Sequence, residues 1–178
     1  MGELDPLRGS AALARRSAPD PLGVMSESVA DSKALFRVPE DDGSANVETL
    51  WAISLGNDEY QLDNSPFYAY SVSWGDVVLA PFDPEEERPT FQRVVKKSGN
   101  RTIRVIFKPP VEDGNSSDKV LQGLVALGCS YEGANRGYMS INIPPSASLS
   151  DVADYLLAEK AQWEYADPSY SELFPNDA

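Results

Sequence analysis

The stretch that decides the fold is CSYEGANRGYMSINI, residues 129–143. Apolar and polar residues alternate in its second half, which predicts two short β-strands on either side of the glycine-rich turn GANRG. The apolar positions of the second strand are Met139, Ile141 and Ile143, and the polar ones are Tyr138, Ser140 and Asn142. We therefore expect a sheet with only one fully apolar face.

Helical spacing appears on both sides of this strand pair. Residues 117–127 carry an apolar stripe and are predicted to form an amphipathic helix that Ser117 caps and Gly128 ends. Ser148 begins a second amphipathic helix. Two more strands are predicted: RTIRVIF before the first helix and QWEYADP after the second. The order from Arg101 is strand, helix, strand, strand, helix, strand, which predicts a ferredoxin-like unit over residues 101–168, with both helices on one sheet face.

The other face of this sheet needs a covering or a function. Alternation places five residues on it: Arg104, Ile106, Tyr138, Ser140 and Asn142. This set is too apolar for a purely solvated face. Two interpretations stay open: an N-terminal β unit packs there, or the face is a binding platform.

Residues 34–100 have the pattern of a small β unit, a strongly bent sheet or barrel. VETLWAISL and EYQL form a hairpin about Gly56-Asn57-Asp58, and TFQRVVKK and RTIRVIF form a second hairpin about Ser98-Gly99-Asn100. Residues 1–33 contain scattered proline and glycine and predict a disordered leader, within which Met25 reads as an alternative start. Residues 169–178 are expected to form a C-terminal tail, and the whole chain is expected to be an α+β protein.

The first hairpin leads into LDNSPFYAYSVSWGDVVLAPF, residues 62–82, whose last part, DVVLAPF, is predicted to be another strand. If the chain is extended there, Tyr68, Tyr70 and Trp74 fall on one face together with Val72. Such an aromatic stripe is either core or a partly exposed contact surface. The acids that bracket it, Asp63 and Asp76, could form an acid/base pair, although both positions also suit turns.

The formal net charge of −13 restricts the partners. It argues against nucleic acid, which is bound through basic faces, and it favours a basic protein. Acidic runs such as Glu85, Glu86 and Glu87 lie between turn-forming residues, where they either keep the chain in solution or contact that partner. The sequence has no apolar run of transmembrane length and no signal-peptide pattern, so we expect a cytoplasmic protein with no membrane partner.

Composition also excludes several kinds of chemistry. The chain has no histidine and one cysteine, Cys129, which removes histidine-dependent nucleophiles and the usual zinc sites. No phosphate-binding glycine motif occurs. We therefore expect no cofactor, no metal and no catalytic residue set, with Arg136 in the GANRG turn as an exposed contact residue.

The segments VETLWAISLGNDEYQLDN, LDNSPFYAYSVSWGDVV and FQRVVKKSGNRTIRVIF resemble the bacterial family called domain of unknown function 4265. The likeness covers most of residues 36–167, and the pattern NxPFYAYxxxxGDVV is its most specific part. The sequence departs from the family in the leader and in loops such as DPEEERP. The resemblance implies a compact, two-part intracellular bacterial protein and brings no activity, substrate or catalytic residue.

The leading interpretation is a non-enzymatic, acidic protein-binding module, immunity-like or regulatory, that masks a basic protein. One alternative is a small-molecule sensor with its ligand between the two units, and another is an enzyme that uses carboxylates alone. The candidate ligand or partner contacts are Asp63, Tyr68, Tyr70, Trp74, Asp76, Glu85, Glu86, Glu87, Arg136 and Tyr138.

Overall fold

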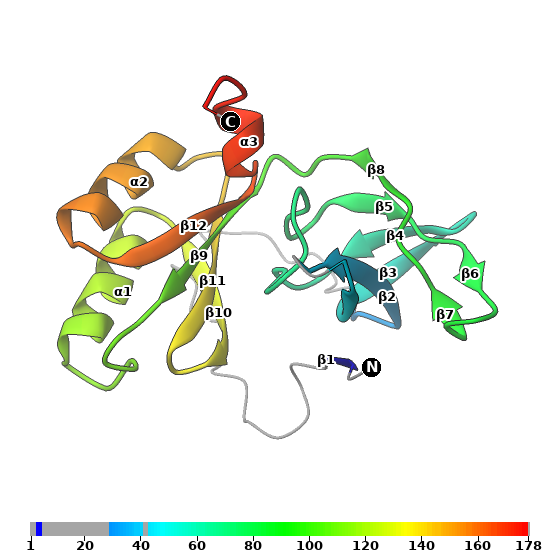
Figure 1. Cartoon of the computed structure of the whole chain (residues 1–178), viewed down its shortest axis with the longest axis horizontal. Helices are drawn as coiled ribbons and strands as arrows, with labels where there is room; N and C mark the ends of the chain where they lie inside the picture. The colour runs from blue at the N-terminus through cyan, green and yellow to red at the C-terminus, as the bar shows by residue number, and fades with distance from the viewer. Residues whose placement is uncertain (1–2, 5–28, 41–42, 178) are drawn as a thin grey trace.

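The computed structural model describes residues 3–4, 29–40 and 43–177, and most of the expected leader lies outside them. The chain is an α+β protein, as predicted, with two main antiparallel sheets and three helices in the described residues (Figure 1). The first sheet contains β1 (Glu3–Leu4), β2 (Ser32–Pro39), β3 (Ala45–Gly56), β4 (Glu59–Leu62), β5 (Val77–Leu79) and β8 (Arg93–Lys96). Apart from the parallel pair of β1 and β3, its strands are antiparallel.

Local sequence explains the first hairpin. β3 and β4 pair across Asn57 and Asp58, which both adopt positive φ angles of 54° and 60°. Asparagine and aspartate tolerate this left-handed conformation better than most residues. The predicted hairpin is therefore confirmed. A separate two-stranded sheet, β6 (Phe82–Asp83) with β7 (Arg88–Pro89), carries the acidic DPEEER loop.

The second half contains β9 (Arg101–Ile106), α1 (Ser116–Ala126), β10 (Ser130–Asn135), β11 (Tyr138–Ile143), α2 (Leu149–Ala158) and β12 (Gln162–Asp167). Its four strands lie in the order β10-β11-β9-β12, and each neighbouring pair is antiparallel. Both long helices cover the same face of this sheet (Figure 1). A short helix, α3 (Tyr170–Leu173), follows β12 within the segment expected to be a tail.

Two apolar cores follow from this arrangement. In the second half, the alternating residues Ile103, Val105, Met139, Ile141 and Ile143 are fully buried against α1 and α2, as the alternation predicts. A separate cluster, which includes Leu50, Leu62 and Val72, fills the first half. The described residues therefore contain two apolar cores, and the parts of the chain around these cores are here called the two units.

The second predicted hairpin is wrong. β8 pairs with β5 in the first sheet, whereas β9 pairs with β11 and β12 in the second. The turn at residues 98–100 instead carries the chain from one sheet to the other. It is held by groups distant in sequence: Asp76 accepts the Ser98 N–H at 2.7 Å, and the Trp74 carbonyl accepts Asn100 Nδ2 at 2.8 Å.

Two smaller expectations also change. The first helix is capped by Asn115 rather than Ser117, because the Asn115 side chain accepts the Asp118 N–H at 2.8 Å. Ser148 caps the second helix as predicted. The segment expected to be extended, here called the aromatic loop (residues 63–76), forms bends and turns instead, and Ser71 has a φ of 59°.

Candidate functional site

The aromatic loop is shaped by one buried carboxylate. Glu48, at 0% exposure in the middle of β3, accepts the backbone N–H groups of Phe67, Tyr68 and Ala69 at 2.6, 3.0 and 2.7 Å. Burial raises the pKa of Glu48 above its usual value, while these three hydrogen bonds oppose the shift. A carboxylate that accepts hydrogen bonds from several backbone N–H groups fixes the conformation of a loop whose backbone is not paired as a β-strand.

The loop in turn covers the open face of the second sheet. Ser140 Oγ donates to the Pro66 carbonyl at 2.8 Å, and the Tyr138 hydroxyl donates to the Phe67 carbonyl at 2.6 Å. The buried Arg104 guanidinium donates to the Ala69 carbonyl. Of the two interpretations of this face, packing against the N-terminal half is the one that the structure supports.

A polar cluster joins the two units beside this loop. Lys97 Nζ lies 3.0 Å from Asp76 Oδ2 and 2.7 Å from Asp167 Oδ2, and Ser73 Oγ donates to the same Asp167 oxygen at 2.6 Å. Asp76 is fully buried and also accepts the Ser73 N–H at 2.9 Å. The Asp63 backbone N–H donates to the Trp51 carbonyl of β3 at 2.8 Å. The geometry gives Asp76 a structural role at the joint.

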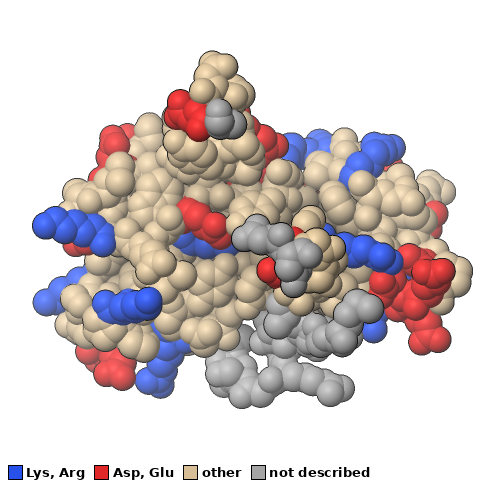
Figure 2. All heavy atoms as spheres, in the orientation of Figure 1, with Lys and Arg blue, Asp and Glu red and all other residues tan. Residues whose placement is uncertain are grey.

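The acidic run lies far from this joint. Glu86 accepts from Arg37 at 2.6 Å, with both side chains partly exposed, and Glu85 and Glu87 are exposed beside it. Figure 2 shows acidic side chains gathered at the end of the molecule formed by β6 and β7. Arg136 is exposed in the turn between β10 and β11. Neither Arg136 nor the acidic run lines the groove described next.

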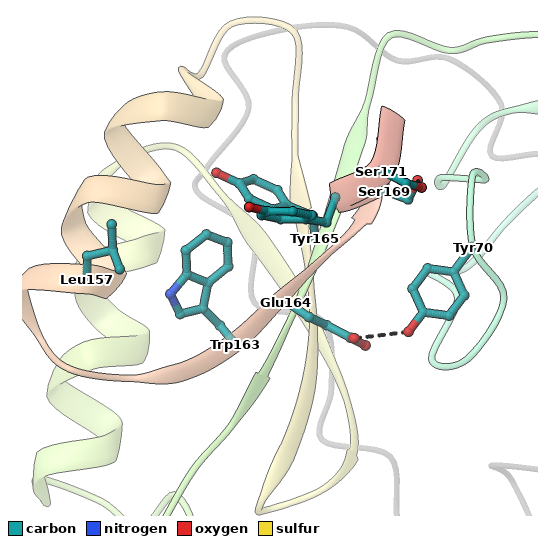
Figure 3. A pocket seen from close by; sticks show the side chains of 8 residues that line it. Tyr70, Leu157, Trp163, Glu164, Tyr165, Ser169 and Ser171 are labelled. Atoms are coloured by element: carbon teal, nitrogen blue, oxygen red, sulfur yellow. Dashed lines mark hydrogen bonds between the residues drawn. The ribbon is translucent and has the colours of Figure 1, made fainter. Parts of the chain in front are cut away.

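A groove of about 770 Å³ lies along β12 (Figure 3). Of the contacts expected from the sequence, Tyr70 lines it; Tyr68, Trp74 and Tyr138 are partly buried elsewhere. The residues that line the groove are Tyr70, Leu157, Trp163, Glu164, Tyr165, Ser169, Tyr170 and Ser171. Several of its apolar side chains are open to solvent, since Leu157 is 63% and Tyr170 53% exposed.

Glu164 divides the groove into two sides. Its carboxylate accepts the Tyr70 hydroxyl at 2.9 Å and Arg104 Nη1 at 3.2 Å, and the Arg104 guanidinium lies 4.5 Å from the centre of the Tyr70 ring. Burial, followed by the hydrogen bond to Glu164, raises the pKa of Tyr70 above its usual value. The Glu164 side chain keeps 46% exposure and can still face a cation in the groove.

Aromatic rings form the rest of the surface. Trp163 packs edge-on against Tyr165 at 4.8 Å between ring centres, and Tyr170 lies 4.7 Å from Phe174. Acidic groups surround these rings: Asp177 accepts the Tyr170 hydroxyl at 3.2 Å, and Glu172 accepts the Ser169 N–H at 2.7 Å. The Ser169 N–H is also the main reason that the pKa of Glu172 is lowered, so this carboxylate stays charged.

Sequence reasoning missed most of this groove. The alternation in QWEYADP places Trp163 and Tyr165 on one side of the last strand, and this was its only local signal. Tyr70, α2 and α3 come from distant segments, so no local pattern could show that they meet there. Among the described residues, no cluster of acidic or cysteine side chains has the arrangement of a metal site. None of the helices in this part of the chain has the length and apolar character that crossing a bilayer requires.

Taken together, the fold and the groove define a two-unit α+β protein with an acidic, aromatic surface groove. A family model described as "Domain of unknown function (DUF4265)" matches residues 48–165, and the chain belongs to this family. A solved structure described as a hypothetical protein from Neisseria gonorrhoeae has a similar fold. Its TM-score is 0.66 at 18% identity, over 79% of this chain and 96% of that chain. No curated protein matches the chain.

Proposed function

We propose that the protein is a non-enzymatic binding module whose groove along β12 binds a basic protein partner, in an immunity-like or regulatory role. The observation that carries this proposal is the combination of exposed apolar rings with surrounding carboxylates. Tyrosine and tryptophan are the residues that contribute most to protein interfaces, and acids at the rim select a basic partner. Among the described residues that line the groove, Glu164 carries the charge, and Glu172 and Asp177 accept hydrogen bonds from the lining residues Ser169 and Tyr170.

The net charge of −13 supports the same partner class. A strongly acidic protein repels acidic partners and attracts basic ones before contact. We place this role in the cytoplasm, for which the single buried cysteine is compatible support. Fold analogy adds nothing to the choice of partner, because one fold serves many functions.

The finer fold assignment is part of the proposal. The order β10-β11-β9-β12, with the connection strand, helix, strand, strand, helix, strand, supports a ferredoxin-like second unit. In such a unit β12 is an edge strand, and the groove lies along that edge. A crystal structure in which β12 occupies another place in the sheet would remove this assignment.

The experiment is native mass spectrometry of the full chain purified gently from its host, followed by rebinding of the purified partner. The groove variant is Leu157→Ser/Tyr170→Ser. Its matched control is Leu55→Ser/Phe82→Ser, whose side chains are 52% and 62% exposed away from the groove. We expect a stoichiometric basic partner that the control binds normally and the groove variant binds at least about tenfold more weakly.

An acidic partner, or equal binding by both variants, would overturn the proposal. So would a turnover that depends on Asp63 or Asp76, which would favour the carboxylate enzyme. The second candidate is a small-molecule sensor, and the groove volume of about 770 Å³ favours it because that volume is typical of ligand sites. A bound metabolite in the mass spectrum, with thermal stabilisation lost in the groove variant, would select this candidate.

A further inference from the structure

The outer edge of β12 carries backbone groups that face away from the sheet. Phe107, directly after β9, donates its N–H to the Gly137 carbonyl at 2.8 Å, so the backbone of Phe107 points toward β11. Along a strand these directions alternate, so Ile106 and Arg104 point toward β12. Their partners there, Gln162 and Glu164, point back to β9.

It follows that the N–H and C=O groups of Trp163 and Tyr165 point to the outer edge. In the described part of the chain no strand pairs with that edge. Among the described residues, the Ser71 N–H closes one end of this edge by donating to the Ala166 carbonyl at 2.8 Å. Such an open edge is the template on which an extended peptide can add as a further strand.

The groove follows this edge and has two different sides. The rings of Trp163 and Tyr165 lie on the helix side of β12, where they pack against the core cluster, and Leu157 of α2 lies near them (Figure 3). Glu164 and Tyr70 lie on the opposite side, joined by their hydrogen bond. A strand added at this edge would place alternate side chains on these two sides.

We propose that the basic partner binds by adding an extended segment to the outer edge of β12. Apolar residues of this segment face Leu157, Trp163 and Tyr165, and alternating basic residues face Glu164 and Tyr70. This inference rests on the proposed function and adds the binding mode and the sequence pattern of the partner. Charge complementarity excludes a second copy as the favoured occupant, because each copy carries a net charge of −13 and would place its own Glu164 in the acidic groove.

The test uses the full chain and a short synthetic peptide of alternating lysine and valine, with a glutamate and valine peptide as the charge control. Two further lysine–valine peptides are N-methylated on the valines or on the lysines. In strand addition only one set of N–H groups bonds to β12: the valine set if the peptide is antiparallel, the lysine set if it is parallel. We expect one methylated peptide to bind about tenfold or more weakly, the other to bind normally, and the glutamate peptide not to bind.

Amide hydrogen exchange gives a second readout. Peptide binding should protect the amides of Trp163 and Tyr165, which face the edge, and leave Glu164, already bonded to β9, unchanged. Equal binding of both methylated peptides, or no binding of the lysine–valine peptide at millimolar concentration, would overturn strand addition. The proposed function would survive either result if the purified basic partner still distinguished the groove variant from its control.

Self-association is measured separately by light scattering. A dimer that protects Trp163 and Tyr165 without peptide would show that a second copy occupies the edge and would overturn the inference. A monomer whose edge amides exchange freely until the peptide is added supports it.

Discussion

Glu48 determines the conformation of the aromatic loop from a position within β3. Its carboxylate is fully buried and bonds three successive backbone N–H groups. Without Glu48, the backbone N–H groups of Phe67, Tyr68 and Ala69 would lose the carboxylate that accepts their hydrogen bonds. One residue therefore connects the first sheet to the surface that covers the second.

We predict that Glu48→Ala lowers the free energy of unfolding by about 3 kcal/mol or more, because it leaves several buried donors unsatisfied. Urea unfolding measures the loss. The control is Glu85→Ala, an exposed position where about 0.5 kcal/mol or less is expected. A similar, small effect of both substitutions would show that water replaces the carboxylate without cost.

The pH dependence of this difference has a definite sign. Because burial raises the pKa of Glu48 above 4.5, the folded state binds its proton more tightly than the unfolded state does. The contribution of the side chain is complete below pH 4.5 and declines as pH rises through the folded pKa. Unfolding of the parent chain and Glu48→Ala should thus differ most at low pH, and a difference that grows toward neutral pH would contradict the prediction.

Among the elements, α1 and α2 pack through a glycine. A Cβ on Gly123 would lie within the Tyr155 side chain, and the Tyr155 hydroxyl donates to the Val120 carbonyl at 3.2 Å. In an exposed helix, Gly→Ala stabilises by about 1 kcal/mol. Here the absence of a side chain on Gly123 leaves the space that the Tyr155 side chain of α2 occupies against α1.

We therefore predict that Gly123→Ala lowers stability by about 1–2 kcal/mol in the parent chain, because the Tyr155 ring must move. In a Tyr155→Ala background the same substitution should raise stability by about 1 kcal/mol, since only helix propensity remains. Thermal or urea unfolding of the parent chain, the two single variants and the double variant completes this double-mutant cycle. The same sign in both backgrounds would show that Tyr155 does not limit the contact.

The elements also show which expectations the sequence could support. Strands β3, β4, β9 and β11 and the two long helices follow from alternation and helical spacing, which are local. The supposed hairpin at residues 98–100 failed because Asp76 and Trp74, more than 20 residues away, hold that turn. The groove joins Tyr70 to residues 157–171, and only the folded chain brings these segments together.

At the scale of the whole molecule, the acidic run of Glu85, Glu86 and Glu87 is separate from the groove along β12. The acidic loop between β6 and β7 lies at one end of the molecule, whereas β12 and α2 lie toward the other (Figure 1). A charge outside the interface changes the rate of encounter, whereas a group inside it changes dissociation. Salt sets the distance over which such an outlying charge acts, since the Debye length is about 8 Å at physiological ionic strength and about 30 Å at 0.01 M.

We predict that Glu85→Gln/Glu86→Gln/Glu87→Gln slows association with the basic partner several-fold at about 0.01 M salt and has little effect near 0.15 M, where the loop charges are screened. Its dissociation rate should equal that of the parent chain, whereas Leu157→Ser/Tyr170→Ser should dissociate faster at both salt concentrations. Surface plasmon resonance with the purified partner measures both rates. Loss of the Arg37 ion pair with Glu86 is no obstacle, since an exposed pair contributes about 1 kcal/mol at most. Faster dissociation of the triple variant would place the acidic loop inside the interface, and the partner would then have to span both ends of the molecule.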